Sequence, residues 1–190
     1  MFFVVVLAMV ALPAVAHPGH AADASPLLAG LAHPFSGLDH LLAMASIGLW
    51  AALLGGRAVW RVPAMFLIGT VAGFGLALAG VGVPAVEPGI AASVLVLGVL
   101  VAWAVRLPLV ASMGVAALFG LFHGQAHGSE LMGAVLGFGS GFVAATAMLH
   151  LSGLAVARIG GGGRGRVLLV RGMGGAVALS GMALLVGSWT

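Results

Sequence analysis

Two short stretches of this chain contain histidines and acids with the spacing of metal ligands. The first, HPFSGLDH, contains His33, Asp39 and His40. The two histidines share a helical face if a helix begins near Pro34, because seven residues make two turns and proline is favoured at the first helical position. Neutral imidazole and carboxylate suit divalent ions such as nickel, cobalt, zinc or copper. This stretch is therefore predicted to bind a metal ion.

The second stretch, FHGQAHGSE, places two histidines four residues apart. His123 and His127 lie on one helical face and can bind the same ion if the helix continues through Gly124. Together the two stretches offer enough ligands for an octahedral ion, even where some side chains only orient the others. The predicted metal-binding residues are His33, Asp39, His40, His123, His127 and Glu130.

Four further residues are weaker candidates, and each has a structural alternative. His17 and His20, in HPGH, belong either to an unstructured terminus or to an arm that collects ions. Glu87 lies between two prolines and is either a solvated loop residue or a ligand. His150 is either a packed helix-contact residue or an inner relay ligand.

The composition excludes a water-soluble protein. Hydrophobic residues make up 62% of the 190 residues and charged residues 6%, whereas soluble domains have about a quarter of their residues charged. The absence of cysteine excludes disulfides and thiolate sites. The few arginines are spread along the chain and form no basic face for nucleic acid. The chain is therefore predicted to lie in a lipid bilayer.

Six apolar segments approach the length of about 20 residues that a membrane-spanning helix needs. The short connections between them have turn chemistry, so residues 17–190 are predicted to form one all-α, six-helix transmembrane bundle. Residues 1–16 resemble a signal peptide ending in small residues, although they have no basic residue; an uncleaved first helix is the alternative. The predicted spans are 38–54, 62–81, 89–105, 109–125, 131–157 and 167–188.

The arginines predict the orientation of this bundle. All seven fall on one side of an alternating six-span topology, and the positive-inside rule makes that side cytoplasmic. The N- and C-termini are then periplasmic after signal cleavage. In this topology every histidine and acid except His150 lies at the outer face or the outer ends of spans. The arginines are Arg57, Arg61, Arg106, Arg158, Arg164, Arg166 and Arg171.

Small residues at helical spacing predict close helix packing. Gly69 and Gly73 form a GxxxG pattern, and a similar ridge follows in the fifth span. Packing within the chain is the first interpretation, and a homo-oligomer interface is the second. The ridge consists of Gly133, Gly137, Gly141 and Ala145.

At these residues the chain resembles the HupE/UreJ family of nickel permeases, which is associated with hydrogenase and urease accessory genes. Both family motifs are intact, H-x5-D-H at 33–40 and F-H-G-x-A-H-G-x-E at 122–130. The resemblance implies a secondary permease of the bacterial inner membrane with six spans and no cofactor. Its substrate would be Ni²⁺, or Co²⁺, for metalloenzyme maturation.

Two other functions are alternatives to transport. A haem-binding membrane cytochrome needs histidine pairs that face one another from different helices at matched depth. Here every histidine except His150 lies on the outer side of the predicted bundle. An intramembrane protease would use Ser140 with His150, but ten residues of helix separate them by about 15 Å. That distance exceeds the hydrogen-bond reach of a nucleophile and its base. Transport is therefore the preferred function, and the chain is predicted not to be an enzyme.

Overall fold

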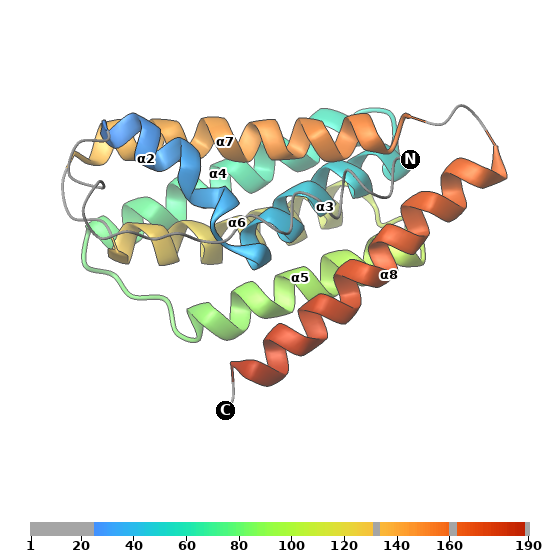
Figure 1. Ribbon diagram of the computed structural model, residues 1–190. Coiled ribbons are helices and arrows are strands. Elements are labelled where there is room, and N and C mark those ends of the chain that lie inside the picture. The colour runs from blue at the N-terminus through green and yellow to red at the C-terminus, as the bar shows by residue number, and fades with distance from the viewer. Residues whose placement is uncertain (1–24, 131–133, 160–162, 189–190) are drawn as a thin grey trace.

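The computed structural model describes residues 25–130, 134–159 and 163–188, and all regular structure in these residues is helical (Figure 1). The predicted all-α class is thereby confirmed, while the predicted signal segment 1–16 lies outside the described residues. Two short helices, α2 and η1, precede six longer ones. The bounds are α2 Pro26–Ala32, η1 His33–Phe35, α3 Leu38–Leu54, α4 Ala58–Leu78, α5 Val86–Ala102, α6 Leu109–Glu130, α7 Val135–Val156 and α8 Arg164–Gly187.

Four of these helices are long and apolar enough to cross a bilayer, namely α4, α6, α7 and α8. A fifth is added if the bent pair of α2–η1 and α3 is one span. Helix α5 has 17 residues, or about 25 Å, against a hydrocarbon core of about 30 Å. Their lengths and compositions are those of a membrane protein, whereas the count of six spans stays a prediction.

The chain bends sharply between α2–η1 and α3, at an angle of 80°. Gly37 has an extended backbone (φ −106°, ψ 123°) directly before α3 begins, and the Ser36 hydroxyl donates to the His33 carbonyl at 2.6 Å. The expected helix beginning near Pro34 is therefore wrong. Pro34 lies in a single 3-10 turn, and His33 and His40 belong to different helices.

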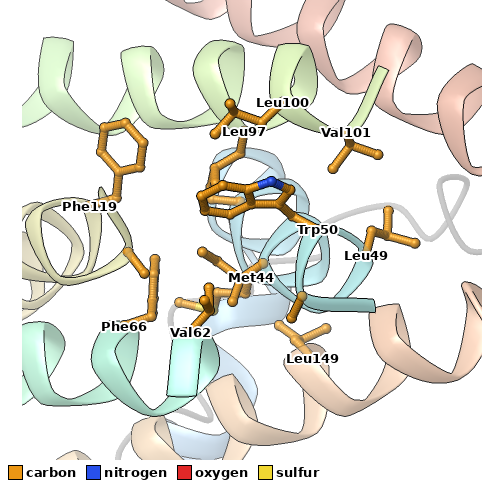
Figure 2. Packing of buried hydrophobic residues seen from close by; sticks show 14 of the residues in the cluster. Met44, Leu49, Trp50, Val62, Phe66, Leu97, Leu100, Val101, Phe119 and Leu149 are labelled. Carbon is orange, nitrogen blue, oxygen red and sulfur yellow. The ribbon is translucent and has the colours of Figure 1, made fainter. Parts of the chain in front are cut away.

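Helix α3 is central, because it contacts α4, α5, α7 and α8. Around it the other helices pair as α4 with α6, α5 with α8, and α2 with α7 (Figure 1). Trp50 and Met44 of α3 point toward side chains of α5 and α4 in Figure 2. The buried Trp50 indole donates to the Val105 carbonyl at 3.0 Å. These contacts fix the position of α3, which contains Asp39 and His40 in its first turn.

Glycines allow α4 and α6 to touch along their backbones. A Cβ at Gly69 or Gly73 would overlap the backbone of α6, and a Cβ at Gly120 or Gly124 would overlap that of α4. The predicted use of Gly69 and Gly73 in packing within the chain is confirmed. Later residues of α4 face later residues of α6, so the two helices run parallel.

Candidate metal centre

Four histidines from three helical segments lie together at the end of the bundle where α3 begins and α6 ends. His33 lies in η1, His40 in the first turn of α3, and His123 and His127 in α6. The centroid of the His127 ring is 4.5 Å from the centroid of the His33 ring and 4.5 Å from that of the His40 ring. His40 lies 4.7 Å from His123 and 6.4 Å from His33. The structure therefore brings together the four histidines that the sequence singled out.

Helix geometry explains this arrangement. Helix α6 continues unbroken through Gly124, as predicted, so His123 and His127 lie one turn apart on the same face. The His40 ring contacts both of them from α3. The bend at Gly37 turns η1 back over this point, and His33 reaches His127 although it does not share a helix with His40.

Several ring nitrogens of this cluster are buried without a hydrogen-bond partner in the described part of the chain. His123 is 0% exposed, His127 2% and His40 9%. Buried polar groups in proteins are nearly always paired, and leaving one unpaired costs about 1–3 kcal/mol. Nitrogen lone pairs gathered in this way are ligands for a transition-metal ion. The unpaired atoms are His40 Nε2, His123 Nδ1, and Nδ1 and Nε2 of His127.

Asp39 orients His40. Its Oδ1 atom lies 2.7 Å from His40 Nδ1 and accepts the backbone N–H of His40 at 2.8 Å. A carboxylate at Nδ1 holds the proton there, which leaves the His40 Nε2 lone pair directed into the cluster. This is the carboxylate–histidine pattern found behind many metal ligands. In the structure Asp39 thus contacts His40, and its predicted role as a metal ligand stays a prediction.

The described residues do not form a finished coordination shell. No group of three or more of their His, Asp or Glu side chains is already arranged to hold a metal ion. The His33–His127 and His40–His123 pairs meet edge to face, at 85° and 88°. Side chains would therefore have to move before three of these residues could share an ion.

His150 lies outside this cluster, in the second half of α7. It is 3% exposed, and neither of its ring nitrogens has a hydrogen-bond partner in the described part of the chain. The Phe66 ring lies 5.5 Å from His123 and 5.1 Å from His150, so one aromatic side chain contacts both (Figure 2 shows Phe66 in the core). His150 also lines a cavity of about 220 Å³ between α4 and α7.

The other candidates are less well placed. Glu87 is exposed in the first turn of α5. Glu130 is the last residue of α6, and its side chain is not among the described parts of the structure. His17 and His20 also lie outside the described residues. The predicted roles of these residues stay predictions.

Sequence reasoning missed four residues that contact the histidines, one of which is Phe138, whose ring lies 5.5 Å from that of His33. The Phe142 ring lies 4.2 Å from the His127 ring, Phe66 contacts His123, and the Ser93 hydroxyl lies 3.0 Å from His123 Nε2. Each belongs to an apolar helical segment whose sequence has no unusual spacing. Only the packing of α4, α5 and α7 against α3 and α6 shows that they border the cluster.

Comparison with known proteins gives one family. The family model described as HupE / UreJ protein matches residues 5–184. The chain is also 48% identical over 183 residues to Protein HupE of Rhizobium leguminosarum bv. viciae, covering 95% of each chain. No solved structure matches the chain.

Proposed function

Because the chain belongs to the HupE/UreJ family, we propose that it carries Ni²⁺, and also Co²⁺, into bacteria across the inner membrane. Proteins of this family are of the transporter type and are not enzymes. The cargo would serve the maturation of hydrogenase or urease. The observation that carries the proposal is the cluster of buried ring nitrogens without partners, contributed by His40, His123 and His127.

The contacts between the histidines, with a half-buried ring at one end and a completely buried ring at the other, suggest the order in which an ion meets them. His33 is half-buried, His40 and His127 are nearly buried, and His123 is completely buried. Each ring contacts the next, from His33 to His127, then His40, then His123. An ion entering at His33 would exchange water for imidazole nitrogen stepwise, so it would never lose its whole hydration shell at once.

The unfinished coordination shell suits transport better than permanent storage. Conduction requires a site that binds well enough to admit the ion but weakly enough to release it. Side chains that must move before three of them share an ion would give such intermediate affinity. Beyond His123, we propose that the ion passes Phe66 to His150, which lies next to the cavity between α4 and α7.

The geometry disfavours the two alternatives. A haem needs room for its macrocycle between two axial histidines, whereas the cluster rings lie 4.5 to 4.7 Å apart at their closest. For a protease, Ser140 is exposed and donates to the Gly137 carbonyl at 3.0 Å, while His150 contacts Phe66. No hydrogen bond joins Ser140 to His150 among the described contacts.

We further propose that α3 to α8 form six spans, with a cleaved signal at 1–16. Helices α4 and α6 are parallel, as alternate spans of an alternating chain must be. Helix α8 runs antiparallel to α5, because Gly98 meets Ala178 whereas Gly174 meets Ala102. The described arginines belong to the opposite helix ends from the histidine cluster. The positive-inside rule then places the cluster and both termini in or toward the periplasm.

Reporter fusions test this topology. Fusions after Gly55 and at Gly162 are expected to report cytoplasm, and those at Val86 and Thr190 periplasm. Paired alkaline phosphatase and fluorescent-protein reporters distinguish the two sides. A cytoplasmic C-terminus would contradict the six-span count and would place the histidine cluster on the side away from incoming metal.

Uptake into proteoliposomes tests the transport itself. Vesicles containing the purified chain are expected to accumulate radioactive Ni²⁺ and Co²⁺ faster than protein-free vesicles. Zn²⁺ and Cu²⁺ are added as competitors, because imidazole sites bind Cu²⁺ most tightly by intrinsic affinity. Uptake equal to that of protein-free vesicles, with folded protein present, would contradict the proposed function.

A further inference from the structure

Ser93 is a completely buried polar residue on α5 whose hydroxyl has two neighbours. It donates to the Ile90 carbonyl at 2.6 Å, one turn earlier in its own helix. It also lies 3.0 Å from Nε2 of His123 on α6. Serine commonly bonds back to a carbonyl of its own helix in this way. The second contact crosses between helices and ends on a candidate metal ligand.

The hydroxyl proton decides what this contact means. A serine hydroxyl has one proton to donate and lone pairs with which to accept. Because the proton is directed at Ile90, the Ser93 oxygen meets His123 Nε2 as an acceptor. Nε2 must then carry the ring proton, and a neutral imidazole has only one. Nδ1 is left bare, and it is the His123 nitrogen that is buried without a partner.

We propose that Ser93 is a positioning residue that fixes the tautomer of His123, so that His123 binds the metal ion through Nδ1. The inference deepens the proposed transport function and rests on it. The neighbouring ring is set in the opposite way, since Asp39 holds the proton on His40 Nδ1 and leaves Nε2 bare. Two adjacent imidazoles thus offer the ion different nitrogens.

The two partners also differ in strength. A carboxylate behind a histidine makes a charge-assisted hydrogen bond, about twice as strong as that of a neutral hydroxyl, and makes the ring more basic. His40 is therefore the stronger ligand of the pair and His123 the weaker. Because His123 is the more deeply buried, this order lets the ion leave the inner end of the cluster more easily.

Nuclear magnetic resonance of the full chain in lipid nanodiscs reads the tautomer directly. With ¹⁵N-labelled imidazoles, bare and protonated ring nitrogens give well-separated resonances, and a His123→Gln sample assigns those of His123. In the metal-free wild-type chain we expect a protonated Nε2 and a bare Nδ1. In Ser93→Ala we expect a mixture of both tautomers. A wild-type His123 protonated at Nδ1 would overturn the proposal.

Uptake kinetics provide the second readout. Loss of a partner behind a metal ligand typically lowers metal affinity by 10- to 100-fold. Ser93→Ala is therefore expected to raise the half-saturating Ni²⁺ concentration about 10-fold, with a smaller change in maximal rate. Ser93→Thr, which retains the hydroxyl, is expected to restore both the affinity and the tautomer.

Ser112→Ala is the matched control. Ser112 is also completely buried, but within the described part of the chain its hydroxyl hydrogen-bonds to the Leu107 and Pro108 carbonyls and to no histidine. Its loss is expected to leave Ni²⁺ affinity unchanged. Equal affinities and equal tautomers in Ser93→Ala and the wild type would overturn the proposal. Absence of any Ni²⁺ uptake by the wild type would instead contradict the transport function, while the resonances still decide the tautomer.

Discussion

Replacing His127 by leucine is expected to abolish Ni²⁺ uptake while the chain keeps, or even gains, thermal stability. The His127 ring contacts both His33 and His40, so it is the ring through which an ion would pass between them. A leucine has no nitrogen to receive the ion. Initial rates in proteoliposomes are therefore expected to fall to the protein-free level.

The stability expectation follows from the unpaired nitrogens. Neither ring nitrogen of His127 has a hydrogen-bond partner in the described part of the chain, and the side chain is 2% exposed. Replacement by an apolar side chain removes the cost of burying two unpaired polar atoms, about 1–3 kcal/mol each, and leaves no former partner unpaired. Leucine also packs against Phe142, which lies beside the ring. Thermal unfolding in detergent, followed by tryptophan fluorescence, measures this effect.

A purely structural His127 would behave in the opposite way. If the histidine stabilised the fold, His127→Leu would lower the unfolding temperature and activity would fall with it. Uptake near the wild-type rate in a stable variant would show that the ion does not need this ring. Ser112→Ala controls for the loss of a buried polar group elsewhere on α6, and it is expected to retain uptake.

The other members of the cluster are expected to lose uptake too, with different effects on stability. His123→Ala removes the group that donates to Ser93, and Asp39→Ala removes the acceptor behind His40. Asp39→Ala leaves the His40 donors unpaired, and His123→Ala leaves a cavity at a completely buried position, so each is expected to be less stable than His127→Leu. His150→Ala is expected to have a smaller effect on uptake, because His150 lies beyond Phe66.

The helical class could be predicted because it depends on local sequence, and the grouping of the four histidines could be predicted because the predicted six-span topology puts both motifs at the same ends of the spans. Apolar length marks a helix, and the spacing of His123 and His127 defines a face as soon as α6 is continuous. The relation of His33 to His40 could not be predicted in this way. Pro34 favours a helix start, but Gly37 adopts an extended conformation that separates η1 from α3.

Helix α2 was not predicted either, because seven residues are too few to show a reliable period. Its signals are local: Pro26 occupies the first turn, and the Ser25 hydroxyl accepts the Leu28 N–H at 3.3 Å. Ser93 and Phe66 were missed for another reason. Their roles come from contacts between helices far apart in the sequence, and no spacing within one helix reveals such contacts.

The glycines of the motif at 122–130 also have a role, which is to pack α6 closely against α4. Gly124 lies between His123 and His127 and faces the Thr70 carbonyl of α4 so closely that a Cβ would overlap it. Gly128 similarly faces Phe74 and Ala77. The motif therefore does two things, since one face of α6 presents the histidines while the glycines set how closely that helix meets α4.

Replacing Gly124 by alanine is consequently expected to damage the fold and the cluster together. The methyl group cannot be accommodated by a side-chain rotation, because its neighbour is backbone, so α6 must move away from α4. Overpacking of this kind costs about 1–3 kcal/mol, and the close packing of small residues is what joins helices in lipid. We expect a lower unfolding temperature, less folded protein in the membrane, and loss of Ni²⁺ uptake.

Gly114 on the same helix provides the matched control, since a Cβ there meets nothing within 4 Å. Gly114→Ala is expected to be neutral or slightly stabilising, because alanine is favoured over glycine in a helix by about 1 kcal/mol. Helix α4 offers a second pair, in which Gly73 faces α6 and Gly75 faces open space. If Gly124→Ala and Gly73→Ala unfolded at the same temperatures as Gly114→Ala and Gly75→Ala, the close contact of α4 with α6 would be contradicted. The placement of His123 and His127 depends on that contact, so the proposed path of the ion would be contradicted with it.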